Sequence, residues 1–178
     1  MKEYILLLPI IFIFHDMEEI IGFVPFFRKN LYLYERFPKV MNAYRGLTTE
    51  GMAVGVYEEF IPFFGISLLA YYFPDKVLYG LWYGIFLSMT AHFIVHIGHT
   101  LYIRKYIPSF ITSIICLPIS ILILIKCAVF VNFDILTVTF IIIGILLMIA
   151  NLWLAHMLSH FVNRKLRSAE SYYFELPE

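Results

Sequence analysis

The first apolar segment of the chain carries an unusual run of ionisable side chains. The stretch FIFHDMEEIIGF, residues 12–23, places a histidine, an aspartate and two glutamates inside a hydrophobic run. In a helix His15, Glu18 and Glu19 share one face, because residues three and four apart are neighbours, whereas Asp16 points about 100° away. Ionisable groups at membrane depth are costly, and they usually face the interior of a helix bundle and serve a function. We therefore expect this face to point into a polar site.

Later apolar segments contribute seven further histidines and glutamates: His92, His96 and His99 from one, His156 and His160 from another, and Glu58 and Glu59 from a third. The histidines of each segment are three or four residues apart, which keeps them on one helical face. Counted along a helix from the nearest basic residue, several of these groups reach similar depths. We expect four helices to present imidazoles and carboxylates to one layer.

Imidazole and carboxylate together suit zinc, iron or manganese, and no thiolate is available for copper(I) or an iron–sulfur cluster. The two cysteines, Cys116 and Cys127, lie in one apolar run and are typical of small buried hydrophobes. The expected metal ligands are His15, Glu18, Glu58, His92, His96, His156, His160 and His99. The remaining two glutamates, Glu19 and Glu59, are the expected catalytic bases.

This set is larger than the four ligands that one zinc ion needs, and it is similar to the di-metal centres of four-helix bundles. We therefore expect two divalent ions, iron in preference to zinc. His99 and His160 are equally compatible with residues at the membrane rim. Glu58 and Glu59 point about 100° apart, so only one of them can face the site fully.

The composition places this chemistry in a membrane. The 178 residues are 61% hydrophobic, 19% aromatic and only 15% charged, whereas a soluble domain has about 25% charged residues. The mean hydropathy is +0.82. A net charge of zero argues against nucleic acid as a partner. We predict an all-α polytopic membrane helix bundle that forms one domain over residues 1–178.

Runs of about 20 apolar residues predict five membrane-spanning helices: roughly 4–25, 50–73, 77–102, 107–131 and 136–162. The fourth of them, 107–131, offers no candidate chemistry and is expected to be a scaffold. Segment 26–47 interleaves basic and aromatic residues, which is typical of an amphipathic segment at the membrane surface. Residues 163–178 form the expected C-terminal tail.

The distribution of Lys and Arg predicts the orientation. Segment 26–47, the turn at 104–105 and the tail hold most of the basic residues, and all three fall on one side of a five-span chain. Basic loops are retained in the cytoplasm. We expect the N-terminus outside, the C-terminus in the cytoplasm and the metal site in the cytoplasmic half.

The run His15-Asp16-Met17-Glu18-Glu19 resembles the signature of the HXXEE domain family, small integral membrane proteins named for a His-x-x-Glu-Glu motif. The resemblance covers most of the chain, with the motif in the first span and further histidines in later ones. It implies that His15, Glu18 and Glu19 are functional and that His92, His96 and His156 correspond to the later histidines. It does not imply a substrate.

Three classes of function fit these observations. The first is a metal-dependent membrane enzyme that oxidises or hydrolyses a lipid-like or hydrophobic substrate, with oxidation slightly preferred. The second is a metal or proton transporter, which a homo-oligomer would make easier to build. The third is an immunity-type membrane protein that binds a partner without chemistry. Two enzyme families are disfavoured: the chain has Phe23 and Phe63 where prenyl-protein proteases have an arginine after Glu-Glu, and it lacks the adjacent histidines of membrane desaturases.

Overall fold

The computed structural model describes residues 1–174, with the side chains of 1–42 and 44–166. The described chain consists of helices and the turns that connect them: α1 (Lys2–Ile5), α2 (Leu7–Lys29), α3 (Tyr32–Arg36), α4 (Pro38–Met41), the 3-10 helix η1 (Asn42–Tyr44), α5 (Thr49–Tyr72), α6 (Lys76–Ile103), α7 (Phe110–Ala128) and α8 (Ile135–Phe174). The predicted all-α membrane helix bundle is confirmed.

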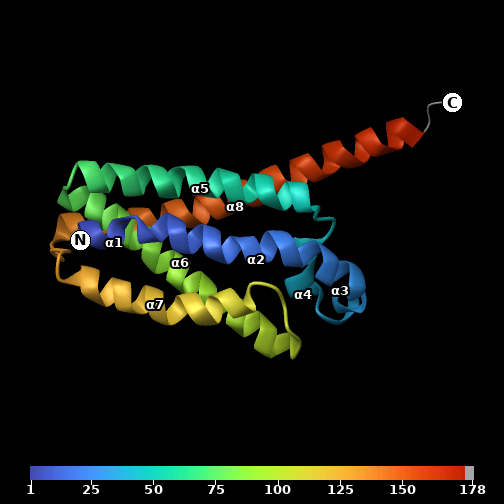
Figure 1. The fold of residues 1–178 in the computed structure, drawn as a ribbon, viewed down its shortest axis with the longest axis horizontal. Coiled ribbons are helices and arrows are strands. Elements are labelled where there is room, and N and C mark those ends of the chain that lie inside the picture. The colour runs from blue at the N-terminus through green and yellow to red at the C-terminus, as the bar shows by residue number, and fades with distance from the viewer. Residues whose placement is uncertain (175–178) are drawn as a thin grey trace.

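Five long helices run along the bundle, with the N-terminus at one end and the last turns of α8 beyond the other (Figure 1). Four of them, α5, α6, α7 and α8, are long and apolar enough to cross a membrane. Helix α2 has 23 residues, a comparable length, but its middle carries Asp16, Glu18 and Glu19. The five helices correspond closely to the five predicted spans.

The main departure from the prediction is at the C-terminal end. Helix α8 does not stop near residue 162 but continues to Phe174, for 40 residues in all. At about 1.5 Å per residue it is roughly twice as long as the hydrocarbon layer is thick, so its C-terminal part extends beyond the other helices (Figure 1). Residues 175–178 of the expected tail lie outside the described residues.

Two pairs of glycines, each four residues apart, let α8 pack closely against its neighbours. Gly80 and Gly84 on α6 lie against α8, where a Cβ atom on Gly84 would collide with the carbonyl oxygen of Ile141. Gly51 and Gly55 on α5 also lie against α8, but nearer to its C-terminal end. Small residues at this spacing allow backbones in a membrane to approach closely and to gain van der Waals contact. They hold α5, α6 and α8 together around the interior.

The segment between α2 and α5 folds back onto one end of the bundle as three short helices. Its apolar side chains join a second core made of Phe23, Phe27, Leu33, Met41, Ile103 and Ile107. The basic side chains of the predicted segment 26–47, the first two of which lie in the last turn of α2, are all exposed: Arg28, Lys29, Arg36, Lys39 and Arg45. The predicted amphipathic segment is therefore present, as a cap that covers this end with apolar residues inward and cations outward.

The main apolar core fills the other end and reaches the middle of the bundle. Trp82 is fully buried, stacks on Phe86 and donates its indole N–H to the carbonyl of Ile5 at 2.9 Å. About two helical turns beyond Phe86, the ring centroid of Phe93 lies 4.7 Å from that of the His15 imidazole. The polar site thus begins where this apolar core ends.

Candidate metal centre

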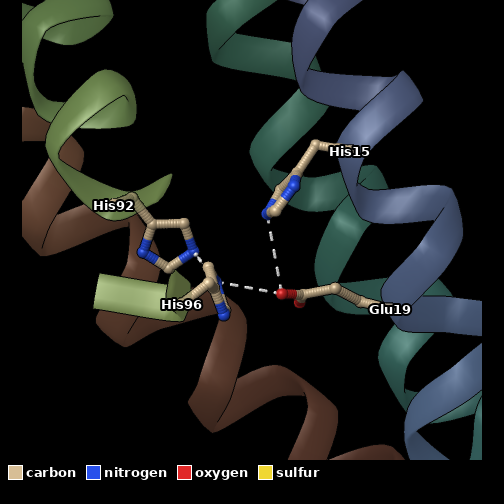
Figure 2. Close-up of side chains that lie close together, drawn as sticks. All are labelled: His15, Glu19, His92 and His96. Atoms are coloured by element: carbon tan, nitrogen blue, oxygen red, sulfur yellow. Dashed lines mark hydrogen bonds and ion pairs between the residues drawn. The ribbon is translucent and has the colours of Figure 1, made fainter. Parts of the chain in front are cut away.

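Helices α2 and α6 each supply two residues to one buried cluster, which we call the His/Glu cluster: His15, Glu19, His92 and His96. Figure 2 shows the four side chains pointing toward one another from the two helices. Each helix contributes residues four positions apart, so that one face of each helix carries both groups. One potential ligand atom from each residue lies within 4.8 Å of all the others.

The distances in the cluster match the dimensions of a metal site. Glu19 Oε1 lies 3.7 Å from His15 Nε2 and 3.0 Å from His96 Nε2, and the Nε2 atoms of His92 and His96 are 2.7 Å apart. Ligands bound to one tetrahedral ion at about 2.0–2.1 Å lie about 3.3 Å from one another. These three separations lie on both sides of that value, and all four ligand atoms lie within 4.8 Å of one another, so the side chains would have to close around an ion to bind it together.

Two atoms of the cluster lack hydrogen-bond partners. His15 Nε2 and Glu19 Oε1 are buried and make no hydrogen bond, and these are the atoms that face the centre of the cluster. Buried polar atoms are nearly always satisfied, and an exception calls for an explanation such as an ion. A bound cation would satisfy both atoms at once.

A threonine on α7 sets the tautomer of His15. The Thr112 hydroxyl donates to Glu18 Oε2 at 2.6 Å and lies 2.9 Å from His15 Nδ1. Because its single proton goes to Glu18, Thr112 can only accept from Nδ1–H of His15. The imidazole is then left with its lone pair on Nε2, the nitrogen that faces Glu19. Outer hydrogen bonds of this kind orient the histidine ligands of metal sites.

Ser109 holds His96 in a similar way. Its buried hydroxyl lies 2.8 Å from His96 Nδ1, leaving Nε2 to face the cluster. Ser109 precedes α7 with a φ of 83°, in the left-handed region that non-glycine residues seldom adopt. Strained backbone of this kind persists where the surrounding structure requires it, often at functional sites. The N-terminal turn of α7 therefore supports two of the three histidines.

The two glutamates of the motif have different positions. Glu19, the expected catalytic base, lies inside the His/Glu cluster. Glu18, an expected ligand, lies outside it and accepts hydrogen bonds from the Thr112 backbone N–H at 2.8 Å and the Tyr106 hydroxyl at 2.6 Å. Glu18 is thus connected to the cluster indirectly, by its hydrogen bond with Thr112, whose hydroxyl in turn contacts His15.

A cavity of about 70 Å³ adjoins the cluster and contacts both Glu19 and His96. Its other ionisable lining residues are His92 of the cluster, Tyr44 of η1, and Asp16, Glu59 and His156, from α2, α5 and α8. Glu59 is buried, and its Oε1 atom has no hydrogen-bond partner. The volume is enough for about two water molecules. Glu59, the second expected base, is therefore placed beside the cluster and not within it.

Three expected ligands lie apart from both the cluster and this cavity. Glu58 is half-buried on α5, next to Glu59 in sequence but outside the cavity lining. The His99 ring is 6.4 Å from that of His96, centroid to centroid, and His160 is half-buried on α8. The structure brings His15, His92 and His96 together and sets His156 at the cavity wall.

Sequence reasoning missed Ser109 and Thr112. We expected segment 107–131 to be a scaffold without chemistry, but its first turn makes the outer hydrogen bonds of the site. The available signal was Ser109 directly after Pro108 and Thr112 three residues later, at the start of a largely apolar helix. Hydroxyl groups at a helix start are common caps, so this signal alone does not reveal a role at a metal site.

A family model described as "Protein of unknown function with HXXEE motif" matches residues 6–123 of the chain. The matched region includes the whole His/Glu cluster together with Ser109 and Thr112. Neither a curated protein nor a solved structure matches the chain.

Proposed function

This chain belongs to the family of proteins with the HXXEE motif, and we propose that it is a membrane-embedded metalloenzyme acting on a lipid-like or hydrophobic substrate. The His/Glu cluster would hold one divalent ion, and the adjoining cavity would receive the reacting atoms. The observation that carries this proposal is the convergence of four potential ligand atoms within 4.8 Å, two of them buried without hydrogen-bond partners.

The outer hydrogen bonds support metal binding over a structural role. An imidazole that served only as a packed polar residue would use both nitrogens in hydrogen bonds. Here Thr112 engages His15 Nδ1, and the buried Nε2 of the same imidazole has no hydrogen-bond partner. His96 Nε2 lies 2.7 Å from His92 Nε2 and 3.0 Å from Glu19 Oε1, contacts that an ion bound between these atoms would replace. A cation at this point would bind the His15 lone pair.

Three imidazoles and one carboxylate suit zinc or iron. Zinc would activate a water molecule for hydrolysis, and iron would support oxygen-dependent oxidation. The cluster has enough ligands for one ion. A second ion, as a di-metal centre requires, would have to use Asp16, Glu59 and His156 along the adjoining cavity.

Glu59 is the residue best placed to move protons during the reaction. It lines the cavity beside the cluster, and its unpartnered Oε1 is buried there. A carboxylate near a bound water or substrate can take a proton in the chemical step and return it to the product. We assign to Glu59 the role of general base, and to Glu19 that of ligand.

The orientation of the bundle is part of the proposal. The exposed cations of the cap and the turn at Arg104 and Lys105 lie at one end, while Lys76 lies at the other. This asymmetry supports a cytoplasmic C-terminus and an external N-terminus. Fluorescent or enzymatic tags at the two ends would test it, since a C-terminal tag that is active only outside the cell would refute this orientation.

Elemental analysis of the purified protein tests the metal site. We expect about one zinc or iron per chain after purification in mild detergent without chelators. His92→Ala and Glu19→Gln should lose most of this metal, whereas His160→Ala, outside the cluster, should retain it. Metal-free wild-type protein, or equal metal in all four proteins, would refute the proposal.

A further inference from the structure

A second and larger pocket lies at the basic end of the bundle, and we call it the basic-end pocket. It has a volume of about 740 Å³, within the range of small-molecule sites. Its apolar walls come from the end of α2, the start of α3 and α8: Val24, Phe27, Leu31 and Leu166. Apolar walls at the end of a membrane bundle suit the acyl region of an amphiphile.

The rim of the pocket carries two cations and two anions: Arg28, Arg45, Glu35 and Glu50. Among the described side chains, no ion pair joins one of these four charges to another. The four rim charges therefore do not neutralise one another by direct contact. The positive and the negative side chains of the rim are therefore both available to bind a ligand.

Arg45 is held in place before any ligand arrives. Its Nε–H donates to Asn42 Oδ1 at 3.1 Å, and its guanidinium lies 5.5 Å from the centre of the Tyr34 ring. The remaining N–H groups of a guanidinium held in this way can bind two phosphate oxygens at once. Because the two cations and the two anions of the rim cancel, the pocket favours a ligand whose phosphate is joined to a positively charged group.

The basic-end pocket and the cavity beside the His/Glu cluster share two lining residues, Tyr44 and Leu47. Tyr44 stacks on Phe27 with ring centroids 4.8 Å apart, and its carbonyl accepts the Tyr34 hydroxyl. The Tyr44 ring also packs edge-on against Phe23, which lines the cavity beside the cluster, with ring centroids 5.1 Å apart. A ligand in the pocket is therefore next to the proposed metal cavity.

We propose that the basic-end pocket binds the head group of a zwitterionic phospholipid, with its phosphate on Arg28 and Arg45 and its ammonium on Glu35 and Glu50. Under the function proposed above, on which this part rests, such lipids are the substrate class. The position fits, because the pocket opens among exposed cations at the end of the membrane helices, where head groups lie.

Lipid binding to the full-length protein tests the pocket. The probes are dihexanoyl phosphatidylethanolamine and dihexanoyl phosphatidylglycerol, titrated in mild detergent and measured by native mass spectrometry. We expect one phosphatidylethanolamine to bind in preference to phosphatidylglycerol. The double variant R28Q/R45Q should weaken phosphatidylethanolamine binding roughly ten-fold, the loss expected for a charged hydrogen bond. The double variant E35Q/E50Q should remove the preference between the two lipids.

The control is Arg36→Gln. Arg36 is exposed on the same cap and also lies near an aromatic ring, Phe37, but it does not line the pocket. Equal weakening by R36Q, wild-type binding by R28Q/R45Q, or a preference for phosphatidylethanolamine that survives in E35Q/E50Q would overturn the inference.

A metal-deficient variant separates this inference from the proposed function. Phosphatidylethanolamine should bind His92→Ala as it binds wild type, because the pocket lies outside the cluster. Metal in the wild type without lipid binding would overturn the pocket alone. Lipid binding to a wild type that holds no metal would support the pocket and refute its role in supplying a substrate.

Discussion

His15 Nδ1 lies 2.9 Å from the Thr112 hydroxyl oxygen, across the contact between α2 and α7. Since that hydroxyl donates its proton to Glu18, the imidazole must be the donor toward Thr112, and its free lone pair faces the cluster. The histidine and the first glutamate of the motif therefore act together through a residue almost a hundred positions away in sequence.

Thr112→Val should weaken metal binding. The substitution keeps the volume of the side chain but removes the acceptor for His15 Nδ1–H, so the tautomer and the ring orientation are no longer fixed. Loss of such outer contacts typically costs 10–100-fold in metal affinity, and we expect about 10-fold here. Competition with a chromophoric chelator measures it. Thr112→Ser keeps the hydroxyl and should bind like wild type; equal losses in both variants would contradict the role of this hydroxyl.

The two glutamates of the motif should differ in their effect on metal content. Glu19→Gln removes a ligand of the cluster and should reduce affinity by more than about 100-fold, beyond the range for outer contacts. Glu18→Gln leaves the cluster intact and should keep the wild-type stoichiometry, with affinity reduced by no more than about 10-fold. Chelator competition on both variants is the measurement. If Glu18→Gln loses the metal and Glu19→Gln keeps it, the assignment of the two roles is wrong.

Gly84→Ala should destabilise the bundle. A Cβ atom at this position would collide with the backbone of α8 at Ile141, and overpacking of this kind costs about 1–3 kcal/mol. Gly98→Ala on the same helix meets nothing within 4 Å and provides the matched control. Thermal unfolding in detergent should show a lower midpoint for Gly84→Ala only. A midpoint for Gly84→Ala equal to that of Gly98→Ala would mean that α6 and α8 do not pack this closely.

Asp134 lies at the end of the bundle opposite the cap, and it should make the stability of the protein depend on pH. Hydrogen bonds from Thr137 and Lys76 lower the pKa of Asp134 to about 2, below the value of about 3.9 in an unfolded chain. A lowered pKa means that the carboxylate stabilises the folded state above about pH 4, and that this contribution disappears as the pH falls toward 2. Asp134→Asn should therefore unfold at a lower temperature than wild type at pH 7. The difference in unfolding temperature between Asp134→Asn and wild type should shrink as the pH is lowered. A difference that does not change with pH would refute the proposed role of the Asp134 carboxylate.

The fold could be predicted from the sequence because hydropathy and charge act locally. Each apolar run long enough to cross the bilayer became a helix, and the basic and aromatic residues between the first two runs became the cap. The C-terminal end could not be predicted from hydropathy. Residues 163–174 are polar enough to leave the membrane, but they contain no proline or glycine that would end α8.

The site could be predicted only in part. Helical spacing correctly placed His92 and His96 on one face of α6, and it placed His99 on the same face. Which of these histidines meets His15 depends on the position of α2, and spacing does not give that position. Spacing alone could not separate Glu18 from Glu19, since both lie on the face of His15. The separation depends on α7, whose Thr112 binds Glu18, and contacts between distant segments leave little trace in a single sequence.

X-ray absorption spectroscopy at the metal edge tests the central claim most directly. We predict a first shell of three imidazole nitrogens and carboxylate oxygen at about 2.0–2.1 Å, with the multiple-scattering signature of histidine and no sulfur. In His15→Ala the imidazole count should fall by one. A shell of water and carboxylate oxygens without imidazole, or an unchanged spectrum in His15→Ala, would contradict the account.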